Sequence, residues 1–285
     1  MLWFMEGMCF LPVSLVIVSS FSFIVCYAIA TLERHVDPVF PYISDTGVQV
    51  PESQIFSLLI TFAAILGVAT MYTRYKILEK TNDQMSCCHR ILNTITLIVG
   101  IFGCLGMLTV ATFQENTVRI VHDIGAFIAF FFGVLYIGLQ SLISFKMCEN
   151  GSTRTMCLLR LAIFIISFIA MWPMFVCGGL LTDSTLHWHK DDKGYTKHII
   201  SAVCEWIVAF GFVCFFLTYI REFQSGITSG TYGIRPSDYQ RRSHPASQPP
   251  LRREVNRKFQ IGPAVDCCFF QGCFLPISLN WIKWV

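Results

Sequence analysis

The stretch ILNTITLIVGIFGCLGMLTVATFQ, residues 91–114, runs for 24 residues without a charged side chain. A helix needs about 20 apolar residues to cross the hydrocarbon core of a bilayer. No water reaches the backbone there, so only a helix or a closed barrel satisfies its amide and carbonyl groups. Apolar residues lie on all sides of the expected helix, as a lipid-facing helix requires. The stretch therefore predicts one transmembrane helix.

Five other stretches have the same character. They are Gly7–Leu32, Ser53–Thr73, Ile124–Phe145, Leu161–Thr182 and Ile199–Ile220, the last interrupted only by Glu205. The chain is 54% hydrophobic and 14% charged, whereas soluble proteins carry about 25% charged residues. We predict an all-α membrane protein, a bundle of six transmembrane helices over about 10–31, 54–73, 91–113, 124–145, 161–182 and 199–220.

Lysine and arginine indicate the orientation, because the cytosolic loops of membrane proteins carry an excess of both. With six crossings, the N-terminus, the loops 74–90 and 146–160 and the tail share one side, which holds 16 of the 21 Lys and Arg. We expect this side to be cytosolic, so both termini face the cytosol. One alternative stays open: the first stretch is a cleaved signal peptide ending at Ala28-Ile29-Ala30, which leaves five helices.

The tail over 226–285 is expected to be cytosolic and largely disordered, because 226–263 is rich in Gly, Ser, Pro and Arg. Its basic residues are candidates for contact with anionic lipids of the cytosolic leaflet, with a solvated linker as the alternative: Arg241, Arg242, Arg252 and Arg253. In the apolar end, 267–285, the uncharged run Cys267–Ile282 is only 16 residues long, which favours an interfacial segment over a seventh crossing.

Glu205 is the strongest candidate for a functional side chain. An ionisable group inside a transmembrane span is costly and usually faces the bundle or a cavity. His122 and Asp123 open the fourth predicted helix on the same, exofacial side. The alternative interpretation is that Glu205 bonds a neighbouring segment and that Asp123 stabilises a helix N-terminus through the dipole.

Two short motifs in the exofacial loops are further candidates. Asp45-Thr46-Gly47 matches the active-site triplet of aspartic proteases, but no second copy exists to share a proton, so a turn is favoured. In that turn Asp and Thr would bond their own backbone, and the Gly permits a positive φ. His187-Trp188-His189 lies close to Asp191, but this spacing is not diagnostic of zinc. We expect no bound metal, no cofactor and no nucleic-acid partner.

Two further features concern packing and modification. Gly100, Gly103 and Gly106 recur at every third position and predict a face on which another helix approaches closely. No strand precedes them, so they are not a nucleotide fingerprint. Cys87 and Cys88 lie beside the membrane on the cytosolic side and are candidates for palmitoylation, with ordinary free cysteines as the alternative.

Four segments carry a resemblance to a known family: PYISDTG at 41–47, TMYTRYK at 70–76, LHWHKDDKGYTKHIISAVCEW at 186–206 and FLTYIREFQS at 216–225. Together they resemble the damage-regulated autophagy modulator family of six-span membrane proteins, in order and spacing from about residue 1 to 226. The chain beyond Gly226 departs from the short tail of that pattern.

The resemblance implies a lysosomal membrane protein that is induced by stress, promotes autophagy and links it to programmed cell death. It implies no catalytic residues, so we expect a non-enzymatic protein. Two other hypotheses stay open. The chain is a transporter or lipid-handling protein that uses Glu205 and the exofacial His and Asp residues, or it is a membrane adaptor that recruits partners through its cytosolic tail.

Overall fold

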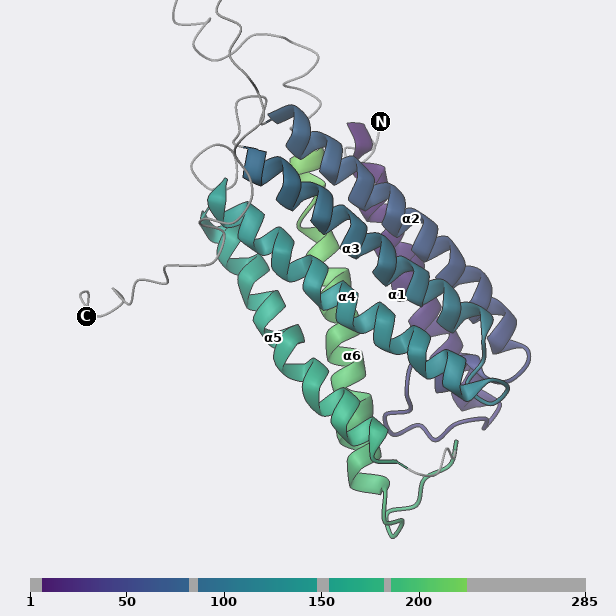
Figure 1. Ribbon diagram of the computed structural model, residues 1–285. Coiled ribbons are helices and arrows are strands. Elements are labelled where there is room, and N and C mark those ends of the chain that lie inside the picture. The colour runs from purple at the N-terminus through teal and green to yellow at the C-terminus, as the bar shows by residue number, and fades with distance from the viewer. Residues whose placement is uncertain (1–6, 82–86, 148–153, 182–185, 225–285) are drawn as a thin grey trace, which may run out of the picture. The chain divides into compact units, whose positions relative to one another are not determined.

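The computed structural model describes residues 7–81, 87–147, 154–181 and 186–224, and this part of the chain is all-helical (Figure 1). Its six long helices are α1 (Phe10–Leu32), α2 (Glu52–Thr81), α3 (Cys87–Thr112), α4 (Arg119–Lys146), α5 (Arg154–Gly179) and α6 (Tyr195–Leu217). Two 3₁₀ turns, η2 (Gly7–Cys9) and η3 (Asp45–Gly47), complete the elements, and the described residues contain no strand. All six helices are long and apolar enough to cross a membrane, as predicted.

The helices run side by side along one direction and form an elongated bundle (Figure 1). Each helix packs against its neighbours in sequence, and α1 also packs against α6, which closes a ring. Large apolar side chains point outward from every helix, among them Ile17, Phe62, Phe102 and Ile169. In water such a surface would be strongly unfavourable, so its environment is the lipid bilayer. The chain is a multi-pass membrane protein.

The interior of the bundle contains many small hydroxyl side chains. Ser19, Thr70, Thr96 and Ser141 are buried, and each donates a hydrogen bond of 2.7–2.8 Å to the carbonyl oxygen four residues earlier. A buried hydroxyl needs such a partner because no water is available in the bilayer core. These four hydroxyls are therefore satisfied within their own helices.

Glycine lets α3 and α4 approach closely, as the small-residue face predicted. A Cβ atom on Gly103 would lie 3.3 Å from the backbone nitrogen of Gly133. On Gly106 it would meet the backbone nitrogen of Ala129 and lie 2.7 Å from the carbonyl oxygen of Gly125. The backbones of α3 and α4 are in contact here, and small residues at such interfaces allow helices to pack closely in lipid.

Helices α2 and α5 extend furthest past the predicted spans, and each continues through a buried arginine. The predicted second span ended at residue 73 and the fifth began at residue 161, in each case next to an arginine. In the structure α2 continues through Arg74 to Thr81, and α5 begins at Arg154 and contains Arg160. Both guanidinium groups are buried and paired with a carboxylate, so their charge does not end the apolar helix.

Candidate functional site

A chamber of about 690 Å³ opens at one end of the bundle, where the α1–α2 and α3–α4 connections meet the first turns of α6. We call it the acidic chamber, because four carboxylates line it: Asp45, Glu115, Asp123 and Glu205. His122 and Arg119 also line the chamber. Three of its residues, Glu205, His122 and Asp45, are sequence candidates whose side chains are buried, and the fold brings all three together.

Glu205 and Trp206, adjacent on α6, hold the loop between α1 and α2. The Glu205 Oε2 atom accepts a 2.9 Å hydrogen bond from the backbone amide of Ile43. Nε1 of Trp206 donates a 2.9 Å hydrogen bond to the carbonyl oxygen of Pro41. Glu205 therefore both lines a cavity and bonds a neighbouring segment, while its functional role stays a prediction. The 41–47 and 186–206 segments, quoted above as separate motifs, contact each other here.

The Asp45-Thr46-Gly47 triplet forms a turn, as expected, but its glycine serves another purpose. Thr46 donates its hydroxyl to the carbonyl oxygen of Ile43 at 2.7 Å and so closes the turn. Gly47 does not use the positive φ that glycine permits, since the turn is a right-handed 3₁₀ helix. A Cβ atom on Gly47 would lie 2.5 Å from the Phe56 ring, so glycine is required for close packing against α2.

Burial and two neighbouring carboxylates act on Asp45. Its side chain is 7% exposed, and both Glu115 and Glu205 lie close enough to repel its negative charge. Burial, followed by these two charges, raises the pKa of Asp45 well above its usual range. Burial also raises the pKa of Tyr42, so its hydroxyl keeps its proton beside them. The chamber thus favours a bound proton or a cationic partner.

His122 and Asp123 take different positions, although they are adjacent in the sequence. His122 is buried and its Nδ1 atom lies 2.8 Å from the carbonyl oxygen of Phe113, which joins the start of α4 to the end of α3. Asp123 is exposed at the rim of the chamber, 3.7 Å from the guanidinium of Arg119 one turn earlier. His122 is therefore an interior residue of the chamber, and Asp123 is a surface residue.

The other two loop candidates lie outside the chamber. His187 contacts Asp37 at 3.3 Å, and Asp191 is exposed. Within the described residues, no three His, Cys, Asp or Glu side chains are grouped closely enough to hold a metal ion. Between them, Trp188 was not predicted, yet it lines the chamber and stacks on the His198 ring at 4.7 Å. Its amide donates to Asp37 at 2.6 Å.

A second, apolar chamber of about 140 Å³ continues from the first into the middle of the bundle. Its walls come from α1, α2, α3, α4 and α6, and include Leu15, Ala63, Met71, Ala209 and Phe212. Five residues line both chambers: Ser44, His122, Ala126, Phe130 and Glu205. Glu205 therefore lies at the boundary between a polar and an apolar space.

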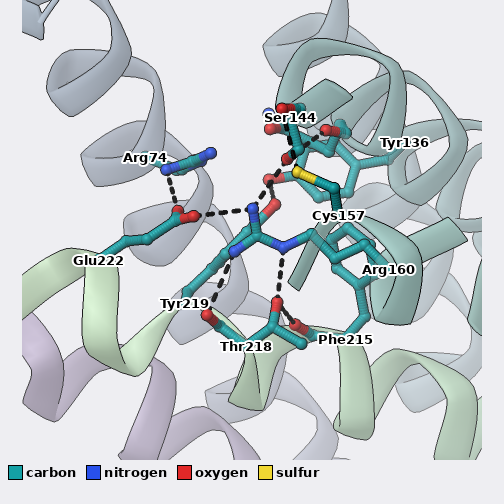
Figure 2. Close-up of polar contacts among 10 residues, drawn as sticks. Arg74, Tyr136, Ser144, Cys157, Arg160, Phe215, Thr218, Tyr219 and Glu222 are labelled. Carbon is teal, nitrogen blue, oxygen red and sulfur yellow. Dashed lines mark hydrogen bonds and ion pairs between the residues drawn. The ribbon is translucent and has the colours of Figure 1, made fainter. Parts of the chain in front are cut away.

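A separate polar cluster joins four helices at the opposite end of the bundle, and the sequence did not predict it (Figure 2). Arg160 of α5 is completely buried and donates to the hydroxyl and carbonyl oxygens of Thr218 at 2.8 and 3.1 Å and to the Ser144 hydroxyl of α4 at 2.8 Å. Glu222, just after α6, pairs with Arg160 at 2.9 Å and with Arg74 of α2. Both guanidinium groups also lie about 5 Å from the Tyr219 ring.

Two predictions fall on parts of the chain that the structure does not describe. Cys87 and Cys88 start α3, but the positions of their side chains lie outside the described part. The candidate lipid contacts Arg241, Arg242, Arg252 and Arg253 lie outside the described residues altogether. Palmitoylation of the cysteines and lipid contact by the tail stay predictions.

The raised pKa of Asp45 predicts a pH-dependent stability. A carboxyl group whose pKa is higher in the folded state than in the unfolded state stabilises the fold fully below the unfolded pKa. That stabilisation is lost as the pH rises through the folded pKa. We therefore expect the purified protein in detergent to melt at a higher temperature at pH 5 than at pH 7.5.

The substitution Asp45→Asn should reduce the difference in melting temperature between the two pH values, because an amide side chain does not titrate. The other titratable groups around it, Glu115, Glu205, Tyr42 and His122, stay in place. The exposed Asp191→Asn variant is the control and should keep it. Thermal unfolding of the three proteins at both pH values provides the measurement. An Asp45→Asn protein with the same pH response as the native chain would contradict the assignment.

The fold and the chambers define a six-helix integral membrane protein with a polar cavity at one end. The family described as Frag1/DRAM/Sfk1/Cwh43P N-terminal domain matches residues 7–226. The chain therefore belongs to this family, and the resemblance seen in the loop motifs is confirmed. Residues 227–285 lie outside the match, in agreement with the departure noted after Gly226.

Individual relatives support the same conclusion. The human DNA damage-regulated autophagy modulator protein 1 is 48% identical over 225 residues, which cover 79% of this chain and 94% of the relative. The Xenopus laevis protein of the same name is 50% identical over 222 residues, covering 78% and 93%. Transmembrane protein 150A of Xenopus laevis is 27% identical over 248 residues, covering 78% and 85%. No solved structure matches the chain.

Proposed function

We propose that this chain is a non-enzymatic modulator of autophagy in the lysosomal membrane and that it links cellular stress to programmed cell death. The observation that carries the proposal is the 48–50% identity to proteins named DNA damage-regulated autophagy modulator protein 1, over nearly their whole length. The six-helix bundle, whose outer surface is apolar, is consistent with permanent residence in a membrane.

The proposed orientation places both termini in the cytosol and the acidic chamber in the lysosomal lumen. Its support is the excess of Lys and Arg on the side of the termini. In this orientation the loop that closes the chamber meets an acidic solution, which suits the raised pKa of Asp45. The buried Arg160 cluster then lies at the cytosolic end.

Glycosylation reports this orientation directly. The double substitution Lys190→Asn and Asp192→Thr places an Asn-x-Thr acceptor in the α5–α6 connection, and we expect it to be glycosylated. The natural Asn150-Gly151-Ser152 triplet, predicted on the cytosolic side, should stay unmodified. The measurement is the glycosidase-sensitive gel shift of the chain made in cells. Sugar on Asn150 would reverse the topology.

The autophagy role is tested by rescue in cells that lack the protein. After DNA damage, the native chain should restore lysosome-dependent turnover of long-lived proteins, and caspase activation should follow. An enlarged pool of autophagosomes without faster turnover would contradict a promoting role. Unchanged turnover in the presence of the native chain would remove the proposal altogether.

A second function, lipid or solute handling, is favoured by one observation: Glu205 lies where the polar chamber meets the apolar one. This function predicts that Glu205→Gln fails to rescue, while a chain lacking 227–285 rescues fully. An adaptor that acts through its tail predicts the opposite pair of results. Asp191→Asn, an exposed carboxylate outside both chambers, is the matched control for the loss of charge.

A further inference from the structure

The acidic chamber carries more negative charge than its own cations can balance. Arg119 lines it, but its guanidinium group lies beside Asp123 at the rim. Among the described residues, Asp45, Glu115 and Glu205 form no ion pair with a Lys, Arg or His side chain. Glu205 is only 7% exposed. A buried carboxylate without a counter-ion is costly, so the chamber is complementary to a cationic group.

Aromatic residues complete the wall of the acidic chamber. Tyr42, Phe130 and Trp188 line it together with the carboxylates. Aromatic faces attract ammonium groups, more strongly where water is excluded. Trp188 is held in place by its stacking on His198 and by the hydrogen bond that its backbone amide donates to the Asp37 carboxylate. Carboxylates combined with fixed aromatic faces indicate an amine rather than a metal ion.

The apolar chamber indicates what is attached to that amine. It is reached past Glu205 and Phe130, and its other walls are mainly apolar side chains and glycine, with Ser19, Ser44, His122 and Tyr136 as polar exceptions. Its volume of about 140 Å³ is close to that of an engineered cavity of about 150 Å³ that binds benzene. An apolar group of about six carbons therefore fits, either a short chain or the first part of a longer one.

We propose that the two chambers form one binding site for a single-chain amphiphilic amine. Its ammonium group lies among Asp45, Glu115 and Glu205, and its alkyl chain enters the apolar chamber past Phe130. The inference rests on lipid handling, the second function proposed above, and names the ligand class for it. It is independent of the autophagy role, which does not require a ligand in this cavity.

Photolabelling of the purified full-length chain in phosphatidylcholine nanodiscs at pH 7 tests the site. The probe is sphingosine carrying a diazirine and an alkyne on its chain. The controls are a fatty acid and a fatty alcohol of equal length with the same two groups. We expect saturable labelling by the amine probe, competed by unlabelled sphingosine, and at least about tenfold weaker labelling by both controls. Equal labelling by the three probes would overturn the proposal.

Two variants separate the two parts of the site. Glu205→Gln keeps an acceptor for the Ile43 amide but removes the charge, and Ala209→Leu fills the apolar chamber one turn further along α6. Each should lower labelling by the amine probe at least about tenfold. Ala162→Leu, on the lipid-facing side of α5, should not change it.

Thermal unfolding of each variant keeps the result interpretable. If Glu205→Gln fails to fold, Asp45→Asn is the second charge variant. Labelling that is unchanged in both Ala209→Leu and a folded charge variant would overturn the site. Normal labelling combined with normal rescue by Glu205→Gln in cells would overturn both the site and lipid handling. If Glu205→Gln loses labelling but still restores autophagy in cells, the binding site stands and the autophagy role does not depend on it.

Discussion

Replacing Arg160 by alanine is expected to remove most of the folded protein. The guanidinium group is completely buried and bonds Thr218, Ser144 and Glu222, which lie on or next to two other helices. Its loss removes the bonds that join α5 to α4 and to the end of α6, and leaves Arg74 as the counter-ion of Glu222. Breaking a buried ion pair by removing one partner typically costs about 3–5 kcal/mol. Native proteins are stable by only about 5–15 kcal/mol, so a loss on that scale removes a large fraction of the stability.

The measurement is the fraction of monodisperse protein in detergent by size-exclusion chromatography, together with the unfolding temperature. Arg154→Ala, an exposed arginine in the first turn of the same helix, is the matched control and should behave like the native chain. Arg160→Lys should lie between the two, because lysine keeps the charge but loses the planar fork of donors. Identical behaviour of Arg160→Ala and Arg154→Ala would show that the cluster does not hold the bundle together.

This cluster also shows what sequence reasoning cannot reach. The six spans were predicted because a charged side chain costs much free energy in lipid. Each long uncharged stretch can therefore be recognised in the sequence without knowledge of the rest of the fold. For the same reason, the predicted second span ended just before Arg74 and the predicted fifth span began just after Arg160. Both arginines are instead compensated by Glu222, 148 residues after Arg74, and such a pairing is visible only once the helices are packed.

The acidic chamber was predicted in part. Glu205, His122 and Asp45 were found because each is an ionisable residue in or beside a span or in a turn motif. Their neighbours Glu115 and Trp188 lie in loops, where a charged or aromatic side chain is ordinary. Only the meeting of three connections at one end of the bundle gives them a common role. His187 and Asp191 were predicted from a short sequence motif in the same way. In the structure they lie outside the chamber, His187 against Asp37 and Asp191 exposed.

The second large effect is expected at Gly106 on α3. Glycine inside a helix is normally less favourable than alanine by about 1 kcal/mol, so Gly106→Ala should stabilise the chain if propensity were decisive. Here the new Cβ atom would meet the backbone nitrogen of Ala129 and lie 2.7 Å from the carbonyl oxygen of Gly125. Backbone atoms of α4 cannot rotate away as a side chain can, so the helices must separate. Overpacking typically costs about 1–3 kcal/mol, which reverses the sign.

Three alanine substitutions measure this effect by unfolding temperature in detergent. Gly106→Ala should melt lowest, and Gly103→Ala, whose Cβ lies 3.3 Å from the Gly133 nitrogen, should be milder. Gly179→Ala, with no atom within 4 Å of its Cβ, should be neutral or slightly stabilising. If the three variants melted together, the distance between α3 and α4 would not be set by glycine. Because the apolar chamber is walled by Gly103 of α3 and Ala129 of α4, a separation at Gly106 should also alter the chamber. Stability and ligand binding are therefore expected to fall together in Gly106→Ala.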